Sequence, residues 1–489
     1  MANAKQPAMP KTPDKKKNAG AATAAPKKSA AAIATPKKPG ATIAAPKKPG
    51  ARKPAARKPA ANYRHARVIS VSLWGEEIGR VIEDPATGYF VFRYAPGFAD
   101  TGIEPAPLQM PASQDAPFSF TDLPAATYRR LPAMLADALP DDFGNALINR
   151  YMADRGISPA AVTALDRLAY MGARSMGALT FKPSLGPREK QPTPLDMAGL
   201  VIAARGAVRG EFAGDDETHA ALRDIIDVGT SAGGARAKAV IAWNEATREI
   251  KSGQFDAPPG FGHWLLKFDG MGGDERLGTP LDYGRIEYAY HLMARAAGIA
   301  MTECRLLEEN GRAHFMTRRF DREGAGTRHH VQTLCAMAHL DYKRKAANSY
   351  SQLFSAAAAL ALDYEDMEEI FRRMVFNVMG RNCDDHTKNF SFRLRQGRRW
   401  ELAPAYDITY SHNPTGEWTY QHLMSVNGKF KDFTADDMLA EARRFAVGTA
   451  PKVIGQVRAA IGRWEEFGRQ AGMPKKEIER IGADLLTLK

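Results

Sequence analysis

The segment RNCDDHTKNFSF, residues 381–392, places two aspartates, a histidine, a lysine and an asparagine directly after an apolar run. That run, IFRRMVFNVMG at residues 370–380, has its apolar residues at the spacing of one helical face. The pattern predicts a buried helix that stops at Gly380. The charged segment therefore begins where a buried helix ends.

Asp384 and Asn389 stand five residues apart in this segment. The catalytic loop of protein kinases, H-R-D-L-x-x-x-N, has the same step between its base and its metal ligand. In that chemistry a carboxylate accepts the proton of the substrate hydroxyl, and an amide oxygen holds Mg²⁺ on the phosphates. Lys388 lies beside both residues, where its charge can balance the transferred phosphoryl group.

The residues after Asn389 predict a short hairpin, FSFRLR and WELAPAYDI around a QGRR turn, which returns Asp407 to the same place. Kinases bring in a second metal-binding aspartate in this way, and Y-D-I (406–408) stands where most of them have D-F-G. Each residue alone also has a structural interpretation, Asp384 and Asp407 as caps and Asn389 as a loop residue. Their joint order and spacing favour catalysis. His386 is expected to brace the loop rather than to transfer protons.

A glycine-rich segment, GTSAGGARAK at residues 229–238, lies upstream. The backbone N–H groups around Gly233 and Gly234 could hold the phosphates of ATP. The segment is neither a Walker A motif nor G-x-G-x-x-G, so an ordinary flexible loop is the alternative interpretation.

Lys267 lies inside the predicted strand HWLLKF, among apolar residues. A partly buried lysine needs a partner or a ligand. Kinases place their phosphate-pairing lysine on such a strand, with a glutamate on the next helix, and Glu287 on the predicted helix 285–299 is the candidate. The alternatives are a lysine that reaches solvent and a solvated glutamate, and Lys238 competes for the phosphate role.

The adenine site is expected at residues 317–320, where a predicted hairpin (302–320, turning at Asn310-Gly311) ends. A kinase hinge at this place would bind adenine through its backbone. Arg318 and Phe320 are the candidate ATP-binding residues of the hinge.

Charge and composition divide the chain into four predicted parts. Residues 1–67 hold 17 Lys and Arg and one Asp, so this segment carries a formal +16 and the other 422 residues carry −3. Its Ala-, Pro- and Lys-rich repeats predict a disordered tail, for which nonspecific contact with nucleic acid and a plain solvated tail are the two interpretations. The body is predicted to comprise a small antiparallel sheet followed by helices (68–190), a mixed part with the glycine-rich loop (191–322) and an α-rich part (323–489).

Three well-separated cysteines and the lack of a long apolar run favour a cytoplasmic protein that is not embedded in a membrane.

The motifs NCDDHTKNFS, PAYDIT, TSAGGARAK and RRFDR together resemble the HipA family of bacterial toxin serine/threonine kinases. The resemblance implies an α+β, bilobal protein-kinase-like fold with an added N-terminal subdomain and an all-α C-terminal lobe. By matching positions, Asp384 is the implied base, Asn389 and Asp407 the Mg²⁺ ligands, and Lys267 the ATP-phosphate lysine. Ser231 matches the serine whose autophosphorylation silences the kinase.

The resemblance also implies the activity and the partners. We expect an ATP- and Mg²⁺-dependent kinase that phosphorylates a protein, such as an aminoacyl-tRNA synthetase or another translation factor. A separate helix-turn-helix antitoxin is the implied partner. Arg318 departs from the family pattern at the hinge, which leaves side-chain contacts with adenine open. The alternative is a DNA-associated regulatory protein in which the kinase-like body is a scaffold or a nucleotide sensor.

Overall fold

The structure, a computed structural model, describes the chain from residue 63 onward with several internal gaps. The described residues are 63–187, 195, 197–209, 225–226, 229, 236–254, 256–269, 282–309, 311–324 and 326–488. All of them belong to one unit, Pro59–Lys489. The predicted disordered tail falls almost wholly outside these residues, and so do Ser231, Gly233 and Gly234 of the glycine-rich loop.

An antiparallel sheet of four strands, in the order β3-β2-β1-β4, opens the described chain. Ile69, Val71 and Leu73 of β1 are buried, as expected for alternate residues of a strand that lies on a core. Turns at Gly75 and Gly88 connect the first three strands, and both glycines have positive φ, +91° and +68°. The strands are β1 (Val68–Leu73), β2 (Glu76–Glu83), β3 (Phe90–Tyr94) and β4 (Leu179–Lys182).

Short helices fill the space between β3 and the next sheet. The helix α3 runs over Asp142–Ala153 and buries one apolar face. The helix α4 starts at a capping box in which the Thr163 side chain and the Asp166 side chain each bind the other's backbone. The helices are α1 (Ala125–Tyr128), α2 (Ala133–Asp137), α3 (Asp142–Ala153), α4 (Ala164–Met171) and α5 (Met197–Arg209), with 3₁₀ turns η1 (Phe98–Thr101) and η2 (Pro159–Ala161).

A second antiparallel sheet, of five strands in the order β6-β5-β7-β9-β8, carries the next part of the chain. Helix α7 crosses this sheet closely at Gly284, where a Cβ atom would lie 1.9 Å from the carbonyl oxygen of Ala313. Only glycine permits that approach, and it brings the next turn of α7 against the sheet. The elements are β5 (Lys238–Trp243), β6 (Ile250–Ser252), β7 (Gly262–Lys267), α7 (Tyr283–Ala296), β8 (Cys304–Glu309) and β9 (Arg312–Arg318).

The part of the chain after residue 322 is mainly helical. The hairpin expected after Asn389 is confirmed as β14 and β15, and β12 adds a third strand to it. This lobe is therefore rich in helix rather than all-α. Its helices are α8 (Leu334–Met337), α9 (Tyr350–Ala359), α10 (Tyr364–Met379), η3 (Thr387–Asn389), α11 (Ala435–Arg444), α12 (Ala450–Ile461), α13 (Trp464–Gln470) and α14 (Lys475–Asp484). Its strands are β10 (Arg322–Glu323), β11 (Thr327–Arg328), β12 (His330–Thr333), β13 (Asn348–Ser349), β14 (Ser391–Leu394), β15 (Trp400–Leu402) and β16 (Met424–Ser425).

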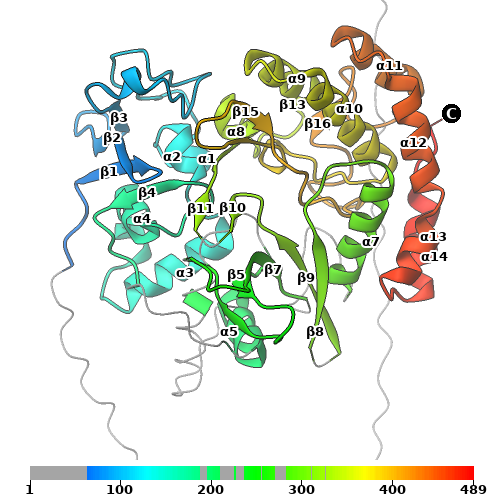
Figure 1. Cartoon of the computed structure of the whole chain (residues 1–489), viewed down its shortest axis with the longest axis horizontal. Helices are drawn as coiled ribbons and strands as arrows, with labels where there is room; N and C mark the ends of the chain where they lie inside the picture. The colour runs from blue at the N-terminus through cyan, green and yellow to red at the C-terminus, as the bar shows by residue number, and fades with distance from the viewer. Residues whose placement is uncertain are drawn as a thin grey trace, which may run out of the picture. The chain divides into compact units, whose positions relative to one another are not determined.

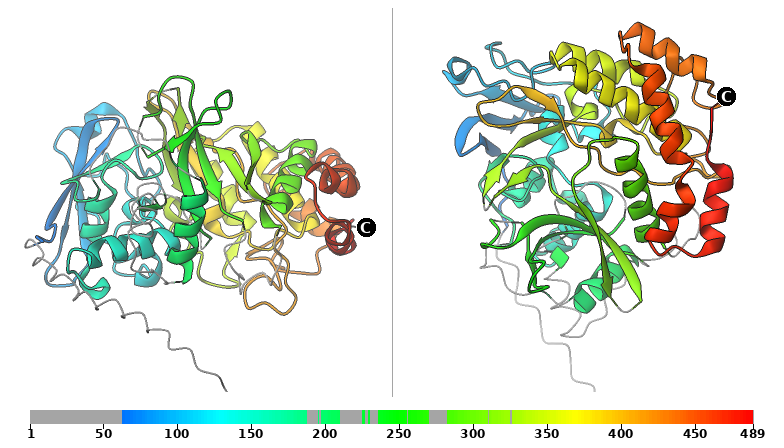
Figure 2. Two further views of the ribbon diagram at one scale, coloured as in Figure 1. Left: turned by 90° about the horizontal axis from the view of Figure 1, so that it is seen from below. Right: turned by 45° about the vertical axis from the view of Figure 1, so that its right-hand side comes forward.

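Two hydrophobic cores organise the described residues. The first lies under the four-stranded sheet and α1–α5 and continues into β5 and β7. The second lies among α7 and the helices α8–α14. Figure 1 and Figure 2 show the four-stranded sheet (blue) and the C-terminal helices (orange and red) on opposite sides of the green five-stranded sheet. The predicted division at residues 190 and 322 stays a prediction, because the first core crosses the former boundary and α7 packs in the second core.

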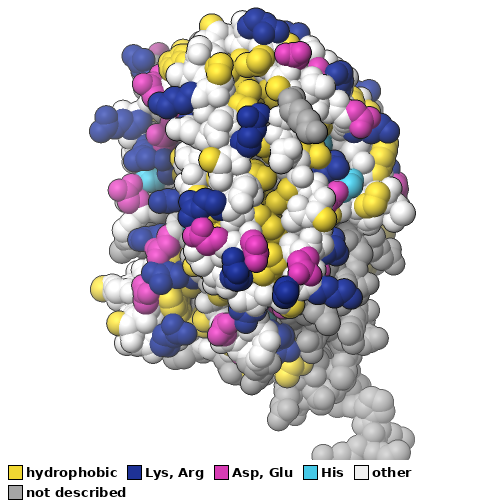
Figure 3. Space-filling model, turned by 90° about the vertical axis from the view of Figure 1, so that its right-hand side faces the viewer, with side chains coloured by type: hydrophobic (Ala, Val, Ile, Leu, Met, Phe, Trp, Pro, Cys, Tyr) yellow, Lys and Arg dark blue, Asp and Glu magenta, His cyan; other side chains and the backbone are white. Residues whose placement is uncertain are grey.

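The surface over the C-terminal helices carries charges of both signs. Figure 3 shows Lys and Arg side chains interspersed there with Asp and Glu and with hydrophobic side chains. A mixed surface of this kind fits the near-neutral charge of the body of the chain. Within the described ranges, every helix is too short or too polar to cross a lipid bilayer.

Candidate active site

The loop after α10 holds Asp384 and Asn389 in a fixed relation. The Asn389 side-chain nitrogen donates to the Asp384 backbone oxygen (2.7 Å), and the Asp384 backbone nitrogen donates to the Ser411 hydroxyl (2.9 Å). The Asp384 carboxylate is half-buried and has no hydrogen-bond or ion-pair partner among the described residues. It is therefore available to accept a proton from a bound substrate.

Asp385, the second aspartate of the doublet, has a different surrounding. Its side chain is fully buried and accepts hydrogen bonds from Tyr350 Oη, His422 Nδ1 and the Leu423 backbone nitrogen, each at 2.8 Å. Burial lowers the pKa of His422, but Cys383 and Asp385 outweigh it and raise that pKa to about 10. Asp385 and His422 thus form a buried ion pair that holds the loop on its interior side.

We did not predict the role of Asp385 from the sequence. A signal was present, because consecutive side chains of an extended segment point to opposite sides. Of two adjacent aspartates beside a buried helix, one must therefore face the interior and needs partners there.

Asp407 reaches the same place through the β14–β15 hairpin. The Tyr406 hydroxyl before it donates to the Lys388 backbone oxygen (2.6 Å), so the two segments are directly connected. Asp407 has φ +55°, an uncommon conformation for a residue with a side chain, which its surroundings must maintain. Its carboxylate binds the Lys267 ammonium. Burial raises the pKa of Asp407, but Lys267 and Lys238 outweigh it and hold that pKa well below its usual range.

Lys267 and Glu287 meet as the sequence predicts. Lys267 ends β7, Glu287 lies one turn after Gly284 on α7, and the Lys267 ammonium donates to Glu287 Oε1 at 2.5 Å. Both side chains are buried. Burial lowers the pKa of Lys267, but Asp407 and Glu287 together raise it above its usual value, so the ammonium stays charged.

Lys238, the competing lysine, lies directly beside Lys267. The two residues are register partners on β5 and β7, and Lys238 is buried. Burial lowers the pKa of Lys238 to about 8, with Asp407 opposing the shift and Lys267 adding to it. The site therefore contains two neighbouring lysines, and the phosphate role of either one stays a prediction.

Lys388 points to a partner from the N-terminal part of the chain. Its ammonium donates to Asp141 Oδ1 at 2.6 Å, just before α3, and lies 5.0 Å from the centre of the Tyr342 ring. Burial lowers the pKa of Lys388, but Asp141 outweighs it and raises that pKa. The predicted role of Lys388 at the phosphoryl group stays a prediction. His386 packs edge-on against the same Tyr342 ring at 5.2 Å.

The predicted hinge residues have most of their backbone groups engaged. The Arg318 backbone nitrogen donates to the Glu303 carbonyl (2.8 Å), and the Phe320 carbonyl accepts from Arg393 Nη1 (2.9 Å). The Arg318 side chain is 59% exposed, and the Phe320 ring lies 5.7 Å from the Tyr406 ring. The predicted adenine contacts of Arg318 and Phe320 therefore stay predictions. A cavity of about 240 Å³ opens next to this segment, lined by residues 258–263 and part of 318–324.

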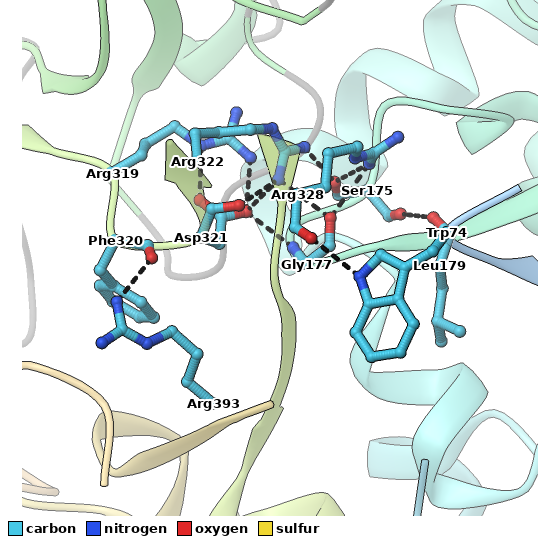
Figure 4. A network of polar contacts seen from close by, with 10 residues as sticks. All are labelled: Trp74, Ser175, Gly177, Leu179, Arg319, Phe320, Asp321, Arg322, Arg328 and Arg393. Atoms are coloured by element: carbon cyan, nitrogen blue, oxygen red, sulfur yellow. Dashed lines mark hydrogen bonds and ion pairs between the residues drawn. The ribbon is translucent and has the colours of Figure 1, made fainter. Parts of the chain in front are cut away.

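Asp321 connects the segment of the predicted hinge to the N-terminal part of the chain (Figure 4). It accepts two hydrogen bonds from Arg319 (2.9 and 2.7 Å), one from Arg322 (2.7 Å) and one from the Gly177 backbone nitrogen (2.7 Å). Burial raises the pKa of Asp321, but Arg319 and Arg322 outweigh it and hold that pKa far below its usual range. Sequence reasoning missed this centre because Gly177 is remote in the chain.

The fold is of the kinase-like class, with a lysine-bearing antiparallel sheet on one side and a helix-rich lobe on the other. The family model described as the HipA N-terminal domain matches residues 69–182, and the one described as the HipA-like C-terminal domain matches residues 230–487. The chain belongs to the HipA family.

Two relatives from Sinorhizobium fredii (strain NBRC 101917 / NGR234) are similar to the chain. "Putative kinase Y4dM" is 23% identical over 445 residues, which cover 86% of this chain and 97% of that protein. "Putative kinase Y4mE" is 27% identical over 276 residues, 52% of this chain and 58% of that protein. Among solved structures, Shewanella oneidensis MR-1 HipA, in a complex with HipB and its operator DNA, has a similar fold. That match has a TM-score of 0.58 and 16% identity, and it covers 85% of this chain and 94% of the other.

Proposed function

We propose that the chain is an ATP- and Mg²⁺-dependent serine/threonine kinase of the HipA toxin type that phosphorylates a protein. The observation that carries the proposal is the meeting of Lys267, Glu287 and Asp407, joined through Tyr406 to the loop of Asp384. These groups come from a sheet, a helix and two loops. A buried lysine shared by two carboxylates, of which Glu287 is buried and Asp407 is partly exposed, is weak evidence for a role in stability alone. The similarity to two proteins named as kinases supports the same activity.

Asn389 and Asp407 fit a magnesium ion. The Asn389 side-chain nitrogen is held by the Asp384 backbone oxygen, which leaves the amide oxygen free to face a cation. Mg²⁺ prefers oxygen ligands and usually keeps waters and substrate phosphates as its remaining ligands, so one amide and one carboxylate suffice. When bound, the ion would neutralise charge on the phosphates of ATP.

The residues of the chain have separate roles in this proposal. Asp384 orients the substrate hydroxyl and accepts its proton while the oxygen attacks the γ-phosphorus of ATP and ADP leaves. Lys267 binds the α- and β-phosphates, held in place by Glu287. Lys388 balances charge at the phosphoryl group once the phosphates compete with Asp141 for its ammonium.

Regulation and partners complete the proposal. Ser231 is the proposed site of autophosphorylation, and a phosphate there would put about two negative charges where the nucleotide phosphates must lie. The protein substrate is an aminoacyl-tRNA synthetase or another translation factor. The complex of Shewanella oneidensis HipA with HipB and operator DNA supports a separate antitoxin as the partner of this chain.

Transfer of labelled γ-phosphate from ATP tests the proposal. Purified full-length protein should incorporate label, and Asp384→Asn should reduce the rate by about 100-fold or more, the usual contribution of a general base. Asp436→Asn, at an exposed aspartate of α11, is the matched control and should keep the wild-type rate. Wild-type protein that takes up no label and labels no added protein would refute the proposal.

The assignment of Ser231 is tested in the same assay. Ser231→Ala should lose most of the label that the chain places on itself, and mass spectrometry of the wild type should find the phosphate on that residue. A full signal at another residue would contradict the assignment and leave the kinase proposal intact.

A second candidate function is DNA-associated regulation, which the +16 segment at residues 1–67 favours. In this case the kinase-like body would bind nucleotide without transferring phosphate. An inert wild-type protein that binds Mg·ATP and DNA would favour this candidate.

A further inference from the structure

A cavity of about 420 Å³ lies in the N-terminal part of the chain, apart from the candidate active site. It is formed by the end of β2, the start of β3, the segment after α1 and the N-terminal turn of α4. Its volume lies in the range of small-molecule sites in proteins, about 300–1,000 Å³.

Three arginines line this cavity, Arg129, Arg130 and Arg167, against a single acidic residue, Glu83, which is exposed. Within the described ranges, none of the three arginines forms an ion pair with a carboxylate. Most arginines elsewhere in this fold have such a partner, for example Arg319 with Asp321. Three guanidinium groups without an ion-pair partner around one cavity concentrate positive charge there.

Arg167 differs from the other two arginines because it is buried, with 7% of its surface exposed. Its guanidinium donates to the side-chain oxygens of Asn145 (2.9 Å) and Asn149 (2.8 Å), both on α3, which are neutral acceptors. Burial, with Arg129 adding repulsion and Asp166 opposing the shift, lowers the pKa of Arg167 to about 10. A buried cation normally forms an ion pair, whereas Arg167 forms none with a carboxylate of the described residues and is attracted by Asp166 only through space.

The neighbouring acidic group attracts Arg167 but forms no ion pair with it. Asp166, next to Arg167 in sequence, accepts hydrogen bonds from His65 (2.7 Å), the Ala66 backbone nitrogen (3.0 Å) and the Thr163 hydroxyl (2.8 Å). Its carboxylate is thus committed to the capping box and to the start of the described chain. The cavity keeps a net positive charge.

Arg129 and Arg130 are held at the cavity by the backbone. Both have positive φ (+53° and +63°), and the Arg130 carbonyl accepts from the Phe90 backbone nitrogen (3.0 Å). The Arg130 guanidinium extends over Gly88, where a Cβ atom would lie 3.3 Å from its Nη1. The two arginines therefore stand on one wall of the cavity, while Arg167 stands on α4.

The remaining lining is apolar, with Phe90, Val162 and Pro159 among its residues. A nucleic-acid backbone binds best to a row of exposed cations, and it could not reach a guanidinium as buried as Arg167. We propose that this cavity binds a small phosphorylated molecule, whose phosphate is held by Arg129, Arg130 and Arg167 and whose apolar part lies against Phe90 and Val162.

Phenyl phosphate and inorganic phosphate are suitable probes, since neither needs the nucleotide site. Isothermal titration of the full-length protein without Mg²⁺ should show one saturable site, with phenyl phosphate bound more tightly than inorganic phosphate. The double variant Arg129→Asn/Arg130→Asn should lower the affinity for both probes by at least about tenfold, the effect of losing one charge-assisted contact. Asparagine is chosen because it tolerates positive φ better than most residues.

Arg93→Gln is the matched control, an exposed arginine of β3 in the same part of the chain, and should bind both probes like the wild type. Thermal unfolding of each variant checks that the fold is intact. The single variant Arg130→Asn changes an exposed side chain. Its affinity for the two probes should lie between those of the wild type and of the double variant if the proposal holds.

Phosphate binding that is equal in the wild type and the double variant would overturn the proposal, as would the lack of saturation with either probe. A third arm uses a labelled DNA oligonucleotide. If only the oligonucleotide binds in an arginine-dependent manner, the cavity is a contact for nucleic acid and the small-molecule proposal fails. None of these results depends on kinase activity.

Discussion

The adjacent residues Asp384 and Asp385 allow the catalytic and structural roles in the loop to be separated. The change Asp385→Asn keeps the size of the side chain and removes its charge. Oδ1 accepts from the backbone nitrogens of Leu423 and Met424, and Oδ2 accepts from Tyr350 and His422. The amide can keep one of these pairs, but its NH₂ group must then face two donors.

The cost follows from the contacts that are lost. With the amide oxygen left on the backbone pair, the bonds to the Tyr350 hydroxyl and the His422 imidazolium are broken, both at 2.8 Å in the wild type. Hydrogen bonds to charged groups contribute about 1.5–3 kcal/mol each, and removing one partner of a buried ion pair costs about 3–5 kcal/mol. We therefore expect Asp385→Asn to lower the free energy of unfolding by about 3–5 kcal/mol.

Asp384→Asn is the matched control at the neighbouring position. Its carboxylate has no partner in the part of the chain that the structure describes, so the free energy of unfolding should change by less than about 1 kcal/mol. Phosphate transfer, in contrast, should fall by about 100-fold or more. The free energy of unfolding is measured by urea unfolding, followed by tryptophan fluorescence. The midpoints of the variants can be compared directly if the dependence of the free energy on urea concentration is the same in each.

The pH dependence gives a second check on the ion pair. The pKa of His422 in the folded protein, about 10, lies above the ordinary histidine value of 6.5, so the stabilisation is fully present below pH 6.5 and is lost as the pH rises through 10. The difference in the free energy of unfolding between the wild type and Asp385→Asn should therefore become smaller as the pH rises toward 10. Equal destabilisation by the two substitutions, or a cost below about 1 kcal/mol for Asp385→Asn, would refute this account of the loop.

The remaining predictions concern the other parts of the molecule. Asp321→Asn should lower the free energy of unfolding by about 3–5 kcal/mol in urea, because Arg319 and Arg322 lose their buried counter-charge, and a change within about 0.5 kcal/mol would contradict the role of this centre. Lys267→Met should weaken Mg·ATP in calorimetry by at least about tenfold, and unchanged affinity would remove Lys267 from the nucleotide site. Asp366 is half-buried and its pKa is raised to about 6 by burial and by Asp363, so its ionisation destabilises the fold increasingly from about pH 4 to about pH 6. Asp366→Asn should raise the free energy of unfolding by about 1–2 kcal/mol at pH 7.5, after allowance for screening by solvent, and should leave it unchanged at pH 4. The same increase at both pH values would exclude the ionisation of Asp366 as its cause. Deletion of residues 1–67 should reduce the salt dependence of DNA retention and leave phosphate transfer unchanged, whereas unchanged retention would exclude a DNA role for the segment.

The parts of the site that sequence could predict are those set by local spacing. The step from Asp384 to Asn389 lies within one loop, and the hairpin that carries Asp407 is short, so both follow from periodicity and turn signals. Lys267 and Glu287 were predictable as a pair because a strand and the next helix are adjacent in the chain. Their contact also needs Gly284, since any larger residue would hold α7 away from β9.

The parts that sequence could not predict depend on contacts between remote segments. Lys388 pairs with Asp141, 247 residues away, and Asp321 accepts from the Gly177 backbone, 144 residues away. Nothing in the local pattern indicates which carboxylate an isolated lysine will meet, because the choice is made by the packing of two cores. The same holds for Arg167, whose neutral partners on α3 become known only from the fold.

The most direct measurement of the central claim is a crystal structure of the full-length protein with Mg²⁺ and a non-hydrolysable ATP analogue. We predict that the phosphates lie against Lys267 and that a metal ion binds the Asn389 amide oxygen and the Asp407 carboxylate at about 2.1 Å, with Asp384 facing the γ-phosphate. A nucleotide bound elsewhere, or a metal ion that contacts neither residue, would contradict the account.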